Sequence, residues 1–159
     1  MKKLKNLDFK RIIIVAYRLP FKLVRKKDEY FTVQNSGGLV SAILSLSEKM
    51  HSGNKAFPKI IWVGSGENQL GNKDNNQQFD LHPVEIPRKI NDKYYGGFCN
   101  NTIWPLFHYF PSRVIYDNRY FEAYVTANNL FLKKLKDLIA PGDLIWIHDY
   151  QLFLLPELV

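Results

Sequence analysis

Short runs of consecutive apolar residues alternate along the chain with longer segments in which apolar residues recur every three or four positions. The runs are typical of strands in a parallel sheet, and the periodic segments are typical of amphipathic helices. The pattern predicts four strands, at Arg11–Tyr17, Lys59–Val63, Leu81–Ile86 and Leu144–Ile147. It predicts two helices, one from Leu39 to a cap at Gly53 and one from about Asn118 to Ile139.

Three segments between these elements have a different character. Residues 21–36 are polar and charged, which predicts a long loop, and Asn68–Gln78 is the most polar stretch and predicts a surface loop. Residues 88–109 form an aromatic-rich block without an assigned element. The last strand follows a Pro141-Gly142 breaker, and its four consecutive apolar residues predict burial on both faces.

Strands that alternate with helices predict an α/β fold with a parallel Rossmann-like sheet and helices on both faces. The chain stops within the helix expected after the fourth strand, so we expect it to be part of a longer protein. In that case residues 152–158 should expose apolar surface, and self-association is expected.

Composition is consistent with one folded domain. The chain has 159 residues, of which 46% are apolar and 14% aromatic. The single cysteine, Cys99, excludes an internal disulfide and indicates a reducing compartment. No apolar run is long enough to span a bilayer, and Ile12–Tyr17 is too short for a signal-peptide core, so we expect a cytoplasmic protein without a membrane partner.

Positive charge is concentrated at the start of the chain. Residues 1–28 hold ten Lys and Arg and two Asp, a net charge of +8, so the rest of the chain carries −1. The basic residues interleave with few aromatic residues and form no nucleic-acid motif. We therefore expect residues 1–10 to be a solvated basic leader, and we expect no nucleic acid as a partner.

Several residues near the predicted strand and helix ends could bind a ligand. Arg18 follows the first strand, where its guanidinium could bind a carboxylate or phosphate, although it could equally be a surface arginine. Gly37-Gly38 before a helix could let backbone N–H groups approach an anion, or could be a simple turn. Tyr95 and Trp104 could contact a sugar, yet aromatic residues are more often part of the core.

His148 and Asp149 follow the last strand, at the edge of a parallel sheet where ligands bind. The alternative is that Asp149 only caps the helix expected to begin near Tyr150, and that His148 is a core histidine. The four histidines and one cysteine lack metal-ligand spacing, so no metal and no cofactor are expected.

Taken together, these motifs resemble the N-terminal part of the trehalose-6-phosphate synthase family. The similarity extends over nearly the whole chain from Arg11 onward. The segments that carry it are Arg18-Leu-Pro20, Ser36-Gly-Gly38, Trp62-Val-Gly64, Tyr94-Tyr95, Asn100–Tyr109 with Trp-Pro-Leu-Phe-His-Tyr, Trp146-Ile-His-Asp-Tyr150 and Leu154-Leu-Pro156.

The resemblance implies a retaining glycosyltransferase with two Rossmann domains (GT-B), of which residues 11–159 would be an incomplete N-terminal, acceptor-side domain. Such an enzyme transfers glucose from a nucleotide sugar, UDP-glucose, to glucose 6-phosphate. Carried over by position, Arg18 and Tyr95 would bind the acceptor phosphate, and Trp104 would line the sugar pocket. Asp149 would accept hydrogen bonds from acceptor hydroxyls, and Gly38 would face the donor diphosphate.

Two positions depart from the family pattern. Gly64 is followed directly by Ser65 where the family usually has a tryptophan, and Gln151 replaces a usual histidine. A relative with a different acceptor, or a non-catalytic sugar-phosphate-binding or regulatory module, is therefore an alternative. The family's donor-binding cations lie beyond Val159, so we expect the 159-residue chain alone to transfer no glucose.

Overall fold

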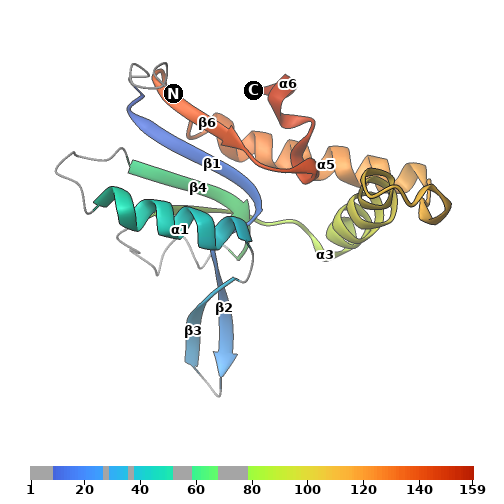
Figure 1. Ribbon diagram of the computed structural model, residues 1–159, viewed down its shortest axis with the longest axis horizontal. Coiled ribbons are helices and arrows are strands. Elements are labelled where there is room, and N and C mark those ends of the chain that lie inside the picture. The colour runs from blue at the N-terminus through green and yellow to red at the C-terminus, as the bar shows by residue number, and fades with distance from the viewer. Residues whose placement is uncertain (1–8, 27–28, 36–37, 52–58, 68–78) are drawn as a thin grey trace.

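The computed structural model describes residues 9–26, 29–35, 38–51, 59–67 and 79–159. Its central sheet contains four parallel strands in the order β5-β4-β1-β6. Figure 1 labels β4, β1 and β6, which lie side by side. Their bounds are Arg11–Arg18 for β1, Lys59–Ser65 for β4, Asp80–Val84 for β5 and Asp143–Ile147 for β6. Numbered along the chain, the four strands have the order 3-2-1-4, which is the order of the first four strands of a Rossmann sheet. The predicted parallel α/β sheet is confirmed, and each strand begins and ends within two residues of its predicted bounds.

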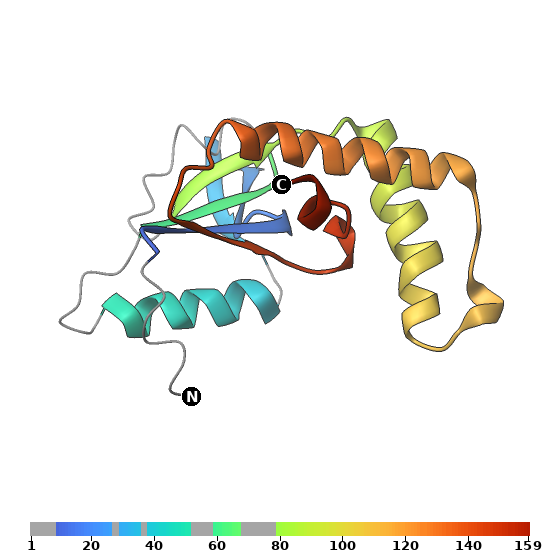
Figure 2. The same cartoon turned by 90° about the horizontal axis from the view of Figure 1, so that it is seen from above.

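Helices cover both faces of the sheet, as predicted. Figure 2 shows the sheet nearly edge-on, with α1 (Gly38–His51) on one side and α5 (Asn118–Lys136) on the other. Neighbouring residues of a strand point to opposite faces. Ile14 therefore packs with Val40 of α1, whereas Ile13 packs with Phe131 of α5. Helix α5 ends three residues before the predicted Ile139, and the predicted cap Gly53 lies outside the described residues.

The prediction that the last strand is buried on both faces is wrong. Leu144 and Trp146 are 38% and 43% exposed, whereas Ile145 and Ile147 pack into the cluster beneath α5. Strand β6 lies at the edge of the four-stranded sheet, in parallel register with β1. A run of apolar residues indicates an apolar environment but does not give the position of its strand in the sheet, so the exposed face could not be foreseen.

Residues 21–36 are not a long loop. They contain an antiparallel hairpin, β2 (Phe21–Lys26) and β3 (Glu29–Gln34), which projects away from the main sheet (Figure 1). Phe21 and Leu23 pack against the cluster that includes Val40, but every residue of β3 is exposed. The two strands pair each other's backbone groups, which satisfies these groups without a neighbouring strand of the main sheet.

The aromatic-rich block forms one continuous helical rod. It consists of α3 (Arg88–Asn91), the π-helical segment η2 (Asp92–Ile103) and α4 (Trp104–Phe107). Segment η2 packs on α5 through a core that contains Tyr94, Cys99 and Tyr124. Burial raises the pKa of the Cys99 thiol to about 12, which keeps it protonated and unreactive at neutral pH.

Three short helical turns complete the chain: η3 (Pro111–Arg113), η4 (Tyr150–Leu152) and α6 (Leu155–Leu158). Residues 152–158 are exposed only in part, contrary to expectation. Leu152 and Leu155 are fully buried beneath α5, whereas Phe153 and Leu158 are exposed. Self-association stays a prediction. The basic leader also stays a prediction, because residues 1–8 lie outside the described residues.

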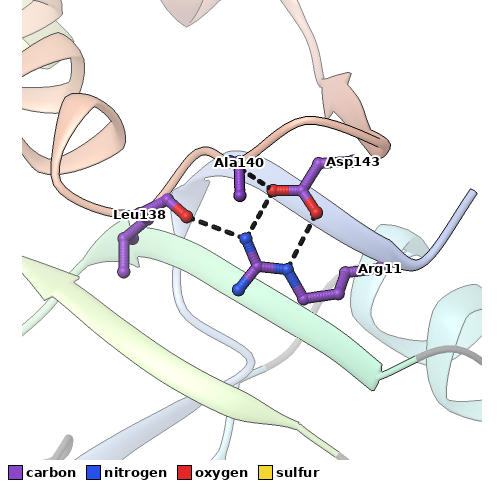
Figure 3. Close-up of polar contacts among 4 residues, drawn as sticks. All are labelled: Arg11, Leu138, Ala140 and Asp143. Carbon is purple, nitrogen blue, oxygen red and sulfur yellow. Dashed lines mark hydrogen bonds and ion pairs between the residues drawn. The ribbon is translucent and has the colours of Figure 1, made fainter.

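An ion pair fastens the start of β1 to the start of β6. Arg11 Nε donates to Asp143 Oδ1 over 2.8 Å, and Arg11 Nη2 donates to Asp143 Oδ2 and to the Leu138 carbonyl (Figure 3). The Ala140 N–H also donates to Asp143 Oδ2, over 2.8 Å. The Asp143 side chain is only 2% exposed. The hydrogen bond from Arg11 lowers the pKa of the Asp143 carboxyl below its ordinary value.

This pair should make stability depend on acidity. Because the Asp143 pKa is lower in the folded protein, the unfolded chain binds more protons near pH 4, and the stabilisation is lost as the pH falls through the folded pKa. We expect the urea midpoint to fall more between about pH 5 and pH 3 for the parent than for Asp143→Asn. Asp117, whose pKa Arg119 lowers, contributes equally to both proteins. Equal losses in the two proteins would show that the Asp143 pair does not stabilise the fold.

Candidate functional site

The carboxyl ends of β1 and β6 meet the start of α1 at a pocket of about 290 Å³. Four of the five predicted site residues line it: Arg18, Gly38, Tyr95 and Asp149. They come from four segments that are far apart in the sequence. The site therefore lies where ligands bind in open parallel sheets, outside the carboxyl ends of the strands.

Arg18 is the last residue of β1 and has a fixed backbone. Its carbonyl accepts a hydrogen bond from Trp62 Nε1 over 3.1 Å. Its guanidinium carbon lies 5.4 Å from the centre of the Tyr95 ring, and Arg18 Nη2 lies 3.5 Å from the Tyr95 hydroxyl. No carboxylate of the described residues pairs with this guanidinium. A cation that lines a pocket without a carboxylate partner favours an anionic ligand.

Tyr95 is held in place by Tyr17, which the sequence analysis did not identify as a site residue. The two rings stack with centres 4.2 Å apart and an angle of 7° between their planes. The Tyr17 hydroxyl donates to Asn91 Oδ1 over 2.8 Å, and burial raises the Tyr17 pKa. The Tyr17 phenol thus stays protonated at neutral pH and orients the aromatic wall of the pocket.

Asp149 both caps a helical turn and lines the pocket. Its Oδ1 accepts a hydrogen bond from the Tyr150 N–H over 2.8 Å, at the start of η4. The capping interpretation is therefore correct, but it does not exclude a binding role, because a carboxylate has further acceptor positions. The neighbouring His148 also lines the pocket, and its backbone N–H donates to the Val15 carbonyl.

Gly38 is the first described residue of α1, and no atom of the described residues lies within 4 Å of the position that a Cβ would occupy there. The first turn of α1 contains no acidic residue. A helix N-terminus with open space beside it suits an anion.

Trp104 is the predicted site residue that the structure does not bring into the pocket. It lies in α4, is 42% exposed and stacks on His108 with ring centres 4.0 Å apart. It is not among the described residues that line the pocket. Its contact with a sugar stays a prediction.

A larger hollow of about 540 Å³ lies at the ends of β4 and β5, lined by Ser65, Gly66, Glu67, Glu85, Ile86 and Pro87. It is bigger, but its charged lining residues are two carboxylates, which repel an anion. The smaller pocket also contains one carboxylate, Asp149, but it adds the Arg18 cation and the N-terminus of α1. We therefore assign the candidate site to the smaller pocket.

Gly64 shapes the site, although the sequence analysis noted it only as part of a motif. A Cβ at this position would lie 2.6 Å from the Leu19 nitrogen and 2.7 Å from the Arg18 carbonyl carbon. Only glycine allows β4 to approach the residue that carries the guanidinium so closely. A glycine near a strand end was the available signal, but its neighbour across the sheet could not be read from the sequence.

Within the described residues, no three His, Cys, Asp or Glu side chains are grouped so that they could hold a metal ion. Helices in that part of the chain are also too short or too polar to cross a membrane.

The sequence of the chain is similar to proteins of one known family. The sequence model of glycosyltransferase family 20 matches residues 10–159. An alpha,alpha-trehalose-phosphate synthase (UDP-forming) of Yarrowia lipolytica is 36% identical over 156 residues, which cover 93% of this chain and 32% of that protein. The corresponding synthase of Emericella nidulans is 37% identical over 154 residues, covering 94% of this chain and 30% of that protein.

A solved structure gives the same result. The crystal structure of an alpha,alpha-trehalose-phosphate synthase (UDP-forming) from Burkholderia xenovorans in complex with glucose-6-phosphate is similar to this chain with a TM-score of 0.69 and 25% identity. The similarity covers 93% of this chain and 30% of that one. The chain thus spans about a third of the length of these relatives. Since the family model matches almost all of its residues, the chain belongs to glycosyltransferase family 20.

Proposed function

We propose that this chain forms the acceptor-side part of a glycosyltransferase that transfers glucose from UDP-glucose to glucose 6-phosphate and so makes trehalose 6-phosphate, in trehalose biosynthesis. The observation that carries the proposal is the pocket that brings Arg18, Gly38, Tyr95 and Asp149 together. The names of the relatives support it, because they are UDP-forming synthases and one was solved in complex with glucose 6-phosphate.

The chemistry of the pocket matches a sugar phosphate. A guanidinium and a phenol are suitable donors for a phosphate dianion, and a carboxylate is a suitable acceptor for sugar hydroxyls. A volume of about 290 Å³ is at the lower end of ligand pockets, which suits one monosaccharide phosphate better than a nucleotide sugar in addition. Gly38 at the α1 N-terminus would face the donor diphosphate.

In the proposed reaction, the anomeric hydroxyl of glucose 6-phosphate forms a bond to C1 of the donor glucose. The bond between C1 and the diphosphate oxygen breaks, UDP leaves with the electron pair, and the hydroxyl proton is released. The role of Arg18, Tyr95 and Asp149 is to hold the acceptor in the orientation that this step needs. We also propose a cytoplasmic location, because the one cysteine is a buried free thiol.

The first test is the preference for a phosphorylated sugar. We expect calorimetry with this chain to show tighter binding of glucose 6-phosphate than of glucose. Arg18→Lys keeps the charge but loses the planar two-pronged geometry, so it should weaken glucose 6-phosphate binding by about tenfold and leave glucose binding nearly unchanged.

The matched control is Arg88→Lys, because the side chain of Arg88 is 94% exposed on α3. It should bind both sugars as the parent does. If Arg18→Lys keeps the full preference for glucose 6-phosphate, Arg18 does not bind the phosphate and the proposed acceptor site is wrong.

A further inference from the structure

The backbone of Asp149 has a conformation that residues other than glycine rarely adopt. Its φ is 73° and its ψ is 167°. This region is essentially restricted to glycine, and other residues occupy it only when their surroundings impose it. The backbone of Asp149 is therefore strained at the position where its side chain lines the pocket.

Three buried side chains hold the turn formed by residues 149–153. The Tyr124 hydroxyl donates to the Tyr150 carbonyl over 2.8 Å and accepts from the Phe153 N–H over 2.9 Å. The Tyr94 hydroxyl donates to the Gln151 carbonyl over 3.1 Å, and Asn128 Nδ2 donates to the same carbonyl over 3.2 Å. The three side chains are at most 2% exposed.

This clamp, made of Tyr94, Tyr124 and Asn128, binds only main-chain atoms of the turn. Burial raises the pKa of Tyr124 to about 12, so its phenol remains a donor at neutral pH. The Oδ1 atom of Asn128 is buried without a hydrogen-bond partner among the described residues. Asn128 Nδ2 also donates to the Tyr124 carbonyl of its own helix over 2.9 Å, so this one side chain links α5 to the turn. An unsatisfied buried amide oxygen is costly, so Asn128 is better explained by these two hydrogen bonds than by packing.

We propose that Tyr94, Tyr124 and Asn128 are positioning residues, which hold the 149–153 turn so that Asp149 keeps its strained backbone and presents its carboxylate to the pocket. The identity of the ligand that the carboxylate binds rests on the proposed function. The strain at Asp149 and the clamp are independent of that function, because they follow from backbone angles and hydrogen bonds alone.

The test of the strain measures urea unfolding of the parent and of Asp149→Gly. We expect the midpoint of Asp149→Gly to rise by about 0.5 M, because glycine adopts the conformation without strain and this gain should exceed the loss of the Asp149 cap on the Tyr150 N–H. Asp92→Gly is the matched control, because Asp92 has a helical φ of −60°. Its midpoint should fall. If Asp149→Gly has the same or a lower midpoint than the parent, Asp149 is not strained and the proposal is wrong.

The test of the clamp adds Tyr124→Phe alone and together with Asp149→Gly. Without the Tyr124 hydroxyl the turn can relax, which releases part of the strain at Asp149 and offsets part of the stability lost with the hydrogen bonds. The Asp149→Gly background has no such strain to release. Tyr124→Phe should therefore lower the urea midpoint less in the parent than in the Asp149→Gly background. Equal shifts in both backgrounds would mean that the hydroxyl makes ordinary hydrogen bonds and does not hold a strained residue.

Binding gives an independent measurement. We expect Tyr124→Phe to weaken glucose 6-phosphate binding by about tenfold. Tyr120→Phe, on the same helix with its ring against Gly97, should leave binding unchanged. Unchanged binding in Tyr124→Phe would overturn the positioning role. If the parent itself binds no glucose 6-phosphate, the proposed function fails, while the unfolding experiments still decide whether the turn is strained and clamped.

Discussion

Gly64→Ala should be the most damaging small substitution in the sheet. The added Cβ would lie 2.6 Å from the Leu19 nitrogen and 2.9 Å from the Arg18 carbonyl oxygen, and both atoms belong to backbone that cannot rotate away. Strands β1 and β4 would have to separate at their carboxyl ends. We expect a loss of about 2–3 kcal/mol in the free energy of unfolding, measured in urea, and a displaced Arg18.

Gly96→Ala provides the comparison. No described atom lies within 4 Å of a Cβ at Gly96, and the residue lies inside the helical segment η2, where alanine is favoured over glycine. This variant should be as stable as the parent or slightly more stable. If Gly64→Ala were as stable as Gly96→Ala, strands β1 and β4 would not approach each other at Arg18 as closely as in the structure.

Asp149→Asn should separate the capping role of Asp149 from its proposed binding role. Asparagine is as good a capping residue as aspartate and has the same shape, so it should occupy the Asp149 backbone conformation at a similar cost, and the fold should change little. The amide lacks the charged acceptor that sugar hydroxyls would bind. We expect glucose 6-phosphate to bind this variant about ten to a hundred times more weakly, a cost of about 1.5–3 kcal/mol, by calorimetry.

Asp137→Asn is the control, because Asp137 is an exposed residue at the end of α5. It should bind as the parent does. The results for Asp149 and Arg18 are most informative together. If Asp149→Asn binds normally and Arg18→Lys keeps the preference for the phosphorylated sugar, both residues are structural and the pocket has another function.

The elements that the sequence predicted correctly are those with strong local patterns. The four strands and two long helices each have an apolar run or an apolar stripe, and such patterns follow directly from which side chains are buried. The hairpin β2–β3 was missed because the charged residues of 21–36 indicate a loop, although the Tyr, Phe, Thr and Val residues of β3 favour a strand. The exposed face of β6 was missed because position in a sheet depends on strand order, which is not a local property.

The candidate site was predictable in part for a similar reason. Arg18, Gly38 and Asp149 lie next to strand or helix ends, and these ends meet at one edge of the sheet, so their positions along the chain were informative. Tyr17 and Tyr124 act through other residues. Their roles depend on a stacked ring and on hydrogen bonds to distant main-chain atoms, which no spacing in the sequence reveals.

The central claim is that the pocket at Arg18 binds the phosphorylated acceptor. The most direct measurement is a titration of the ¹⁵N-labelled chain with glucose 6-phosphate, followed through its backbone amide signals. We predict saturable shifts at Arg18, Tyr95 and Asp149, and little change around Glu67 and Glu85 in the larger hollow. Shifts confined to that hollow, or the absence of saturable shifts at the pocket, would contradict the claim.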